Sequence, residues 1–329
     1  MRTKSILLLI IMLAVLLSGC AEEPAAATVS ETRFLMDTVC TITLYGTSDR
    51  ALLNEAFDLC AEYEAILSVT VEGSDIWRIN HAGGTPVTIM PQTAELIRLG
   101  VFYGELSGGK FDITIGRLSA LWDFTGESGI PSSENIESAR DTVDFRKISF
   151  DGNTVQLSDP DARIDLGGIA KGYIADRVAD FLKAQGVHGA VIDLGGDIAV
   201  VGSKPDGTPW RIGVRQPFGG YSELLGAVEL DESSIVSSGT YERQFEENGI
   251  IYHHILDPKT GMPVDSDVIS VTLVAESALT GDIVSTIVIL AGSDSAADLF
   301  SMTPGFVGAL LVLDSGELLE YGDIVFLNL

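Results

Sequence analysis

Positive charge is scarce in this chain. Its 329 residues include 20 lysines and arginines against 47 aspartates and glutamates, which gives a formal net charge of -27. Such a protein repels the phosphate backbone of nucleic acids and the headgroups of anionic membranes. Nucleic acid is therefore excluded as a partner, and a small anionic ligand would need a local positive site.

Cysteine is scarce as well, with three residues in the chain. Cys20 ends the leader described below, whereas Cys40 lies in a strand-like run and Cys60 in a helix-like run. Neither of the last two has the spacing of a metal site. Two buried thiols are the favoured interpretation, and a disulfide between them is the alternative.

The apolar run of the leader is too short to span a bilayer with ease. It covers Ile6–Leu17, follows Arg2 and Lys4, and ends in the tetrapeptide LSGC at residues 17–20. A positive start followed by a short apolar run is typical of a signal peptide. An ordinary secretory signal or an uncleaved anchor is one interpretation of this leader.

The tetrapeptide LSGC resembles the lipobox of bacterial lipoproteins. The resemblance implies a signal peptide over residues 1–19, cleavage before Cys20 and acylation of that cysteine. It also implies an extracytoplasmic protein that a lipid anchors to a bacterial membrane, on the periplasmic or the outer cell-surface side. Residues 20–30 are small, polar and aperiodic, which predicts a tether.

Residues 31–329 predict a single domain of the α+β class. The chain is long enough for a large core, and no regular βαβ series is visible. Apolar residues at helical spacing predict helices over 50–67, 93–107, 167–185, 280–291 and 295–302. Strands are predicted at several places, among them 33–45, 163–166, 191–194, 198–201 and 269–276, with a polar loop at 128–135. The many short strands predict mixed, largely antiparallel sheets flanked by helices.

The first stretch that can carry chemistry is RIDLGGIAKGY, residues 163–173. A strand ends at Asp165, two glycines turn the backbone, and a helix begins with Lys171 one turn inside it. A helix N-terminus offers unpaired N–H groups and a partial positive charge to a phosphate. The spacing fits neither a P-loop nor a Rossmann turn. A glycine entry to a helix in a packed core is the alternative.

The second stretch is HHILDPKTGMPV, residues 253–264. It places His253 and His254, two of the four histidines, close to Asp257 in a polar turn. His254 is our candidate general base, because an ordinary histidine pKa near 6.5 suits proton transfer near neutrality. Asp257 would either orient that ring or cap the turn.

The third stretch, TGDIVSTIVILAG at residues 280–292, carries Asp282 and Thr286 four positions apart on a helix. Both oxygens then lie on one face, and such hard ligands suit Mg²⁺. A capping aspartate and a threonine bonded back to its own helix are the alternative. Together the three stretches predict a site for a ligand that contains a pyrophosphate. A divalent cation would offset the repulsion from so acidic a chain, since two unit charges 4 Å apart interact by about 4 kcal/mol near a protein surface.

Seven motifs, in order along residues 34–292, resemble the ApbE-like family of FAD:protein FMN transferases. They are FLMDT (34–38), GGKFDITIG (108–116), DLGGIAKGY (165–173), DLGGD (193–197), SSGTYER (237–243), HHILDPKTG (253–261) and D-x-x-x-T (282–286). The resemblance implies an ApbE-like, T-fold-like α+β domain and an exported or lipid-anchored enzyme that needs Mg²⁺. Such an enzyme cleaves FAD, releases AMP and joins FMN to a Thr or Ser of an acceptor protein, often a subunit of a membrane redox complex or an extracytoplasmic reductase.

The resemblance also implies roles for single residues. Those that would bind FAD are Met36, Lys110, Phe111, Asp112, Asp165, Lys171 and His253. The Gly168 carbonyl, Asp282 and Thr286 would hold Mg²⁺, and His254 would lie by the pyrophosphate, with Asp257 as the second catalytic residue.

Two features of the sequence leave alternatives open. Thr70 stands where many family members carry a tyrosine that stacks on the ligand, which leaves room for simple hydrolysis of FAD to FMN and AMP. A flavin-binding lipoprotein without catalysis is a third possibility. The second Asp-Leu-Gly-Gly, residues 193–196, is expected to be a structural turn related to the first by pseudo-symmetry, and a duplicated half-fold would explain both copies.

Overall fold

The computed structural model describes residues 27–122, 124, 129–220 and 222–328. The expected signal peptide and the lipidation site Cys20 lie outside the described residues. Within these ranges, no helix has the length and apolar character that a membrane crossing would require.

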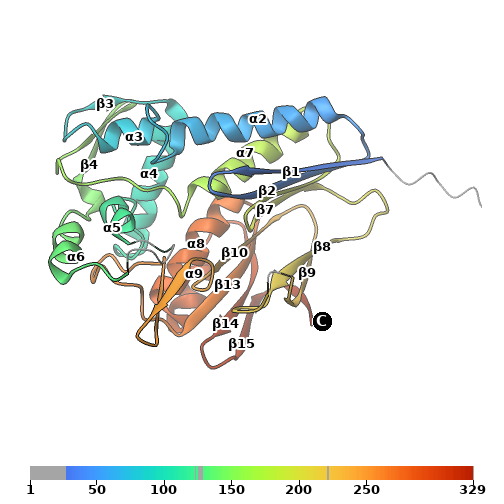
Figure 1. The fold of residues 1–329 in the computed structure, drawn as a ribbon. Coiled ribbons are helices and arrows are strands. Elements are labelled where there is room, and N and C mark those ends of the chain that lie inside the picture. The colour runs from blue at the N-terminus through green and yellow to red at the C-terminus, as the bar shows by residue number, and fades with distance from the viewer. Residues whose placement is uncertain (1–26, 123, 125–128, 221, 329) are drawn as a thin grey trace, which may run out of the picture.

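One large antiparallel sheet organises the molecule (Figure 1). Its eight strands follow in the order β1 (Thr28–Leu35), β2 (Thr38–Tyr45), β6 (Gly189–Leu194), β7 (Asp197–Gly202), β10 (Ser234–Gly239), β13 (Val268–Ala275), β14 (Phe306–Leu313) and β15 (Leu318–Gly322). The sheet has two halves of the same topology, each with two strands, then helices, then two more strands. The α+β class with antiparallel sheets is confirmed, and the shared topology agrees with an internal duplication.

Three helices cover one face of this sheet (Figure 1). α7 contacts β6 and β7, α8 contacts β10 and β13, and α2 contacts α7; their bounds are α2 (Arg50–Leu67), α7 (Ala170–Ala184) and α8 (Ala278–Ala291). Val201 and Val236 belong to the core beneath these helices. Because successive side chains of a strand point to opposite faces, their neighbours Val200 and Ile235 belong to a separate apolar cluster.

A small sheet packs on that second face. Its strands follow in the order β16 (Val325–Asn328), β9 (Leu224–Leu230) and β8 (Trp210–Arg215). Trp210, which is 2% exposed, and Val228, which is fully buried, pack there against Val200 and Ile235. The fold is therefore a helical layer, a central sheet and a smaller outer sheet.

Residues 75–157 form an insertion between α2 and α7, at the left in Figure 1. It contains α3 (Asp75–Asn80), β3 (Val87–Thr88), α4 (Pro91–Leu106), α5 (Gly116–Leu121), α6 (Ser133–Arg140), the 3₁₀ turn η1 (Phe145–Lys147), β4 (Ile148–Asp151) and β5 (Thr154–Leu157). An apolar cluster around Trp122 joins this insertion to Leu256, which follows the hairpin of β11 (Gln244–Glu247) and β12 (Ile250–His253). The remaining elements are η2 (Ser293–Ser295) and α9 (Ala296–Ser301).

The expected single strand over residues 33–45 is wrong, because β1 and β2 form a hairpin. Its two-residue turn consists of Met36 and Asp37, whose φ angles are 53° and 54°. Two left-handed residues make a type I′ turn, which Asn-Gly usually signals, and Met-Asp gave no such signal. β1 also begins at Thr28, so the last residues of the expected tether already pair with β2.

Other boundaries follow the predictions more closely. The helix expected over 50–67 has those limits, and α7 begins at Ala170 after the glycine pair. Residues 163–166 form a single bridge from Arg163 to Ile115 instead of a strand. The end of the expected polar loop at 128–135 belongs to α6. Cys40 and Cys60 are free and buried, which confirms the two thiols.

The two Asp-Leu-Gly-Gly stretches lie in the same half of the sheet. Residues 165–168 lead into α7, whereas residues 193–196 turn β6 into β7. They are not equivalent positions of the two halves, so the expected pseudo-symmetric relation is wrong. The second stretch is a tight turn, with φ of 72° at Gly195 and 98° at Gly196, a conformation that glycine adopts without steric cost.

Close packing of α7 on α8 depends on Gly172. A Cβ on this residue would lie 2.4 Å from the carbonyl oxygen of Ala278 and 2.8 Å from Cβ of Asp282. Gly172→Ala is expected to lower the free energy of unfolding by about 3 kcal/mol, because backbone atoms of a packed helix cannot move aside cheaply. Urea denaturation measures the loss. Gly220→Ala is the control, since its Cβ would meet nothing closer than 3.7 Å, and equal stability of the two variants would contradict the prediction.

Candidate active site

The turn before α7 is held in place by a buried amide. Asn80 donates its Nδ2–H to the carbonyl of Ile164 at 2.8 Å and accepts from the N–H of Ile164 at 2.7 Å. Oδ1 of Asp165 accepts from the N–H of Gly167 at 2.8 Å. The residue before α7, Ile169, makes no side-chain capping bond, and the N–H of Ala170 donates to the carbonyl of Leu166 at 2.8 Å. The N–H of Gly172 in the first turn donates to Asp282, so the start of α7 offers a phosphate its partial positive charge and the ammonium of Lys171.

Asp282 is buried where α7 and α8 meet. Its exposed fraction is 4%, and its Oδ2 accepts from the N–H of Gly172 at 3.1 Å. Burial raises the pKa of Asp282, and the positive charge of Lys171 opposes that rise. A desolvated carboxylate needs strong partners, so this position favours a further positive charge.

The three residues predicted to bind a metal come together where the glycine turn before α7 meets α8. A Cβ on Gly168 would lie 3.9 Å from Oγ1 of Thr286, and that hydroxyl donates to the carbonyl of Asp282 at 3.1 Å. Gly168, Asp282 and Thr286 all offer oxygen atoms, which Mg²⁺ prefers. Among the residues that the structure describes, no group of three or more His, Cys, Asp or Glu side chains is placed to hold a metal. A cation here would therefore need additional oxygens from water or from a ligand.

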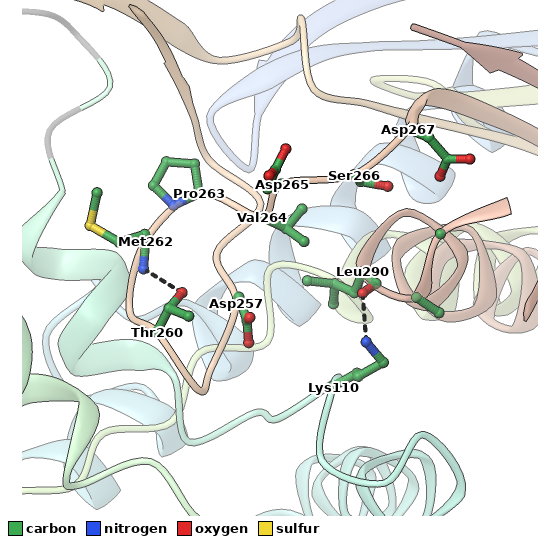
Figure 2. Close-up of a pocket in the computed structure, with 12 residues that line it drawn as sticks. Lys110, Asp257, Thr260, Met262, Pro263, Val264, Asp265, Ser266, Asp267 and Leu290 are labelled. Carbon is green, nitrogen blue, oxygen red and sulfur yellow. Dashed lines mark hydrogen bonds between the residues drawn. The ribbon is translucent and has the colours of Figure 1, made fainter. Parts of the chain in front are cut away.

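The same face of α8 leads to a cavity. Asp282, Thr286 and Leu290 are spaced four residues apart, so they span about 12 Å at the helical rise of 1.5 Å per residue. Nζ of Lys110 donates to the carbonyl of Leu290 at 3.0 Å (Figure 2). The cavity beside them has a volume of about 430 Å³, and the loop that carries Asp257 forms part of its wall. The arrangement suits an elongated ligand with charge near the start of α8 and a bulky group near its end.

The residues next to Lys110 are buried. Phe111 lies against the glycine turn, since a Cβ on Gly168 would be 3.3 Å from its ring. Asp112 accepts hydrogen bonds from the N–H and the hydroxyl of Thr114, at 2.8 and 2.6 Å, and from the N–H of Phe145 at 2.9 Å. Burial raises the pKa of Asp112, and these hydrogen bonds oppose the rise. Both its oxygens thus support the local chain, and its contact with FAD stays a prediction.

Lys171 is held by the second Asp-Leu-Gly-Gly turn. Its Nζ forms an ion pair with Oδ2 of Asp197, the first residue of β7, whose exposed fraction is 2%. Oδ1 of Asp193 in the same turn accepts from the N–H of Gly196 at 3.0 Å. The second turn therefore contributes to the candidate site, although we expected it to be structural only. Asp197 directly follows the two glycines, where the first copy has Ile169, and this difference was the signal available in the sequence.

The hairpin turn at Met36 lies beside that second turn. A Cβ on Gly195 would clash with the side chain of Thr38, the first residue of β2. The N–H of Met36 donates to Oε1 of Glu64 on α2 at 2.9 Å, which fixes the left-handed turn. Met36 is half-buried against the main core. Its position agrees with the predicted contact with a ligand, which stays a prediction.

The two histidines occupy different environments. Nε2 of His253 makes a hydrogen bond with the carbonyl of Val264 at 3.2 Å, whereas Nδ1 of His254 is buried and has no hydrogen-bond partner among the described residues. Burial, with the nearby charge of Arg243, lowers the pKa of His254 to about 4. The expected ordinary pKa near 6.5 is therefore wrong, because tertiary packing removes the ring from water. The ring stays neutral at pH 7, so its lone pair is free to accept a proton, although as a weaker base than an ordinary histidine.

Asp257 caps the turn that follows. Its Oδ1 accepts from the N–H of Lys259 at 2.8 Å, and its carbonyl accepts from the N–H of Gly261 at 2.8 Å. It does not bond to Nδ1 of His254, so the capping interpretation describes its contacts and the orienting one does not. A catalytic role for Asp257 stays a prediction.

These contacts describe an α+β protein in which the glycine turn before α7, the buried Asp282 and a cavity follow one another along α8. The ApbE family model matches residues 36–311. The chain therefore belongs to the ApbE family.

Curated relatives and solved structures agree with this assignment. The chain is 38% identical over 258 residues to the FAD:protein FMN transferase of Klebsiella pneumoniae, covering 77% of this chain and 79% of the relative. The corresponding protein of Treponema pallidum is 30% identical over 315 residues, with 89% and 87% covered. The ApbE protein of Thermotoga maritima superposes with a TM-score of 0.81 at 33% identity, and the flavin transferase ApbE of Vibrio cholerae with 0.79 at 27%; each comparison covers 90% of this chain and 97% of the other.

Proposed function

We propose that the protein transfers FMN from FAD to a Thr or Ser hydroxyl of an acceptor protein and releases AMP. The observation that carries this proposal is the meeting of Asp282 and Thr286 with the start of α7, where Asp282 accepts from the N–H of Gly172 and Lys171 lies in the same turn. This is a place for a pyrophosphate, and the cavity at the far end of α8 offers room for a bulky group. The names of the relatives as FAD:protein FMN transferases support the same reaction.

The residues of the chain would divide the work between binding and proton transfer. Lys171 and the partial positive charge at the start of α7 would bind and orient the phosphates. His254, neutral at pH 7, would accept the proton of the acceptor hydroxyl as its oxygen attacks the phosphorus on the FMN side. A new P–O bond to the acceptor forms, the bond to the bridging oxygen breaks, and AMP leaves with that oxygen.

Mg²⁺ fits the oxygen donors at the start of α8. The Gly168 carbonyl, Asp282 and Thr286 would hold it, and the buried Asp282 carboxylate would gain the positive charge that it needs. When bound, such an ion neutralises charge that develops on phosphoryl oxygens.

We propose that the protein acts outside the cytoplasm. The lipobox-like LSGC at residues 17–20 supports cleavage before Cys20 and a lipid anchor on that cysteine. The acceptor would then be a membrane redox subunit or an extracytoplasmic reductase within reach of the anchored enzyme. The variant Cys20→Ala tests the anchor. After cell fractionation we expect this variant in the soluble fraction instead of the membrane fraction.

Hydrolysis of FAD to FMN and AMP is the second candidate function. Thr70 favours it, because this residue is exposed in the loop before α3 and bonds to Ser68 at 3.0 Å, where an aromatic ring would offer a stacking surface. Transfer and hydrolysis share the phosphate site and differ in the attacking oxygen.

Incubation with FAD, Mg²⁺ and a candidate acceptor protein separates these functions. We expect a covalently fluorescent acceptor whose mass increases by one FMN, together with one AMP per transferred flavin. FMN and AMP in solution without labelled acceptor would instead establish hydrolysis. FAD that stays bound and intact would establish a flavin-binding protein without catalysis.

A further inference from the structure

The buried carboxylate of Asp197 has no part in the mechanism proposed above, although it is paired with Lys171. Its exposed fraction of 2% makes an ionised carboxylate unfavourable without a charged partner. We infer that Asp197 is a positioning residue, which fixes the Lys171 ammonium at the phosphate site beside the start of α7. This inference rests on the proposed function for the identity of the ligand.

The backbone that presents Asp197 is fixed by neighbouring strands. The N–H of Gly196 donates to Asp193 on β6, and the carbonyl of Gly196 accepts from the N–H of Ser237 on β10 at 3.2 Å. Gly195 leaves no space for a side chain against Thr38 on β2. A side chain that positions another group must itself stand on a rigid support, and this turn provides one.

Lys171 has other carboxylates within its influence. An ammonium has three N–H donors, and 29% of the Lys171 side chain is exposed, so it can still reach a ligand. Burial raises the pKa of Asp193, Asp282 and Cys40 and lowers that of His254; the positive charge of Lys171 opposes the three rises and adds to the fall. Without Asp197, the ammonium would be free to approach Asp282, where it would compete with the proposed cation.

A double-mutant cycle tests whether Asp197 acts through Lys171. Asp197→Asn is expected to raise the dissociation constant for FAD about tenfold, the usual scale for a charge-assisted hydrogen bond. Lys171→Gln should raise the dissociation constant for FAD at least as much. Adding D197N to K171Q should then change this constant less than threefold, because the effects of coupled residues are not additive. Asp180→Asn is the matched control, because Asp180 forms an exposed ion pair on the same helix; its affinity should stay within twofold of the wild type. Full affinity in D197N, or multiplying effects in the double variant, would overturn the inference.

Chemical labelling tests the positioning without FAD. Acetic anhydride should label Lys171 at least fivefold faster in D197N than in the wild type, as read by peptide mass spectrometry, while the exposed Lys183 serves as internal reference. Equal labelling would overturn the inference. Faster labelling in D197N combined with a wild type that neither binds nor cleaves FAD would leave the positioning role and remove the proposed function. Circular dichroism checks folding, and Asp197→Ser replaces D197N if that variant does not fold.

Discussion

Asp282→Asn is expected to lower Mg²⁺-dependent cleavage of FAD about a thousandfold, while the protein keeps or gains stability. The lost activity corresponds to about 4 kcal/mol, the scale of charge stabilisation by a bound metal ion. The expected stability has a separate cause, since a buried carboxylate is costly to desolvate and an amide of the same size carries no charge. Turnover as a function of Mg²⁺ concentration and a thermal melt measure the two effects.

The control for this variant is Asp298→Asn, which removes the same charge from an exposed position on α9. Its turnover should equal that of the wild type. Wild-type turnover in D282N would remove Asp282 from the metal site. A large loss of stability in D282N would show that the carboxylate holds α7 and α8 together through the N–H of Gly172 more strongly than its burial cost suggests.

His254→Ala is expected to reduce the rate of FMN transfer by about 10²- to 10⁴-fold, with little change in the affinity for FAD. A positioned general base contributes on this scale, whereas the binding contacts proposed for FAD lie on other residues. Single-turnover transfer and equilibrium binding of FAD separate the two effects. His188→Ala is the control, since this histidine is exposed before β6. An unchanged transfer rate in H254A would exclude the histidine from proton transfer.

The lowered pKa of His254 gives this residue a second test. With a pKa of about 4 the ring is still neutral at pH 5.5, where an ordinary histidine with pKa 6.5 is mostly protonated. Transfer should therefore persist at pH 5.5 and fall only as the pH approaches 4. The stability of the fold should also decrease on acidification. Between pH 6.5 and 4 the unfolded chain binds a proton at His254 while the folded chain does not, so the free energy of unfolding falls as the pH is lowered through that window.

The elements that the sequence predicted best are those with strong local signals. Helix α2 has an unbroken apolar period and was predicted within its limits, and α7 follows the glycine pair as expected. The proximity of Gly168, Asp282 and Thr286 was also predicted from two short stretches of sequence, and their role in binding a metal stays a prediction. Local spacing was sufficient where a single element carries the signal, as α8 does for Asp282 and Thr286.

The features that were not predicted depend on contacts between distant segments. The turn at Met36 and Asp37 has no glycine or asparagine, and the contact of Met36 with Glu64 is visible only after α2 has packed. The pairing of Lys171 with Asp197 joins residues 26 positions apart. The pKa of His254 depends on burial and on the charge of Arg243, which no spacing along the chain reveals.

The direction of β1 limits which proteins an anchored enzyme could modify. β1 runs eight residues, about 26 Å at 3.3 Å per residue, from Thr28 to the turn that adjoins the second glycine pair. A lipid on Cys20 would add at most about 28 Å of extended chain. The hydroxyl to be flavinylated would thus have to lie within roughly 50 Å of the bilayer, which selects acceptors by their height above the membrane as well as by their sequence.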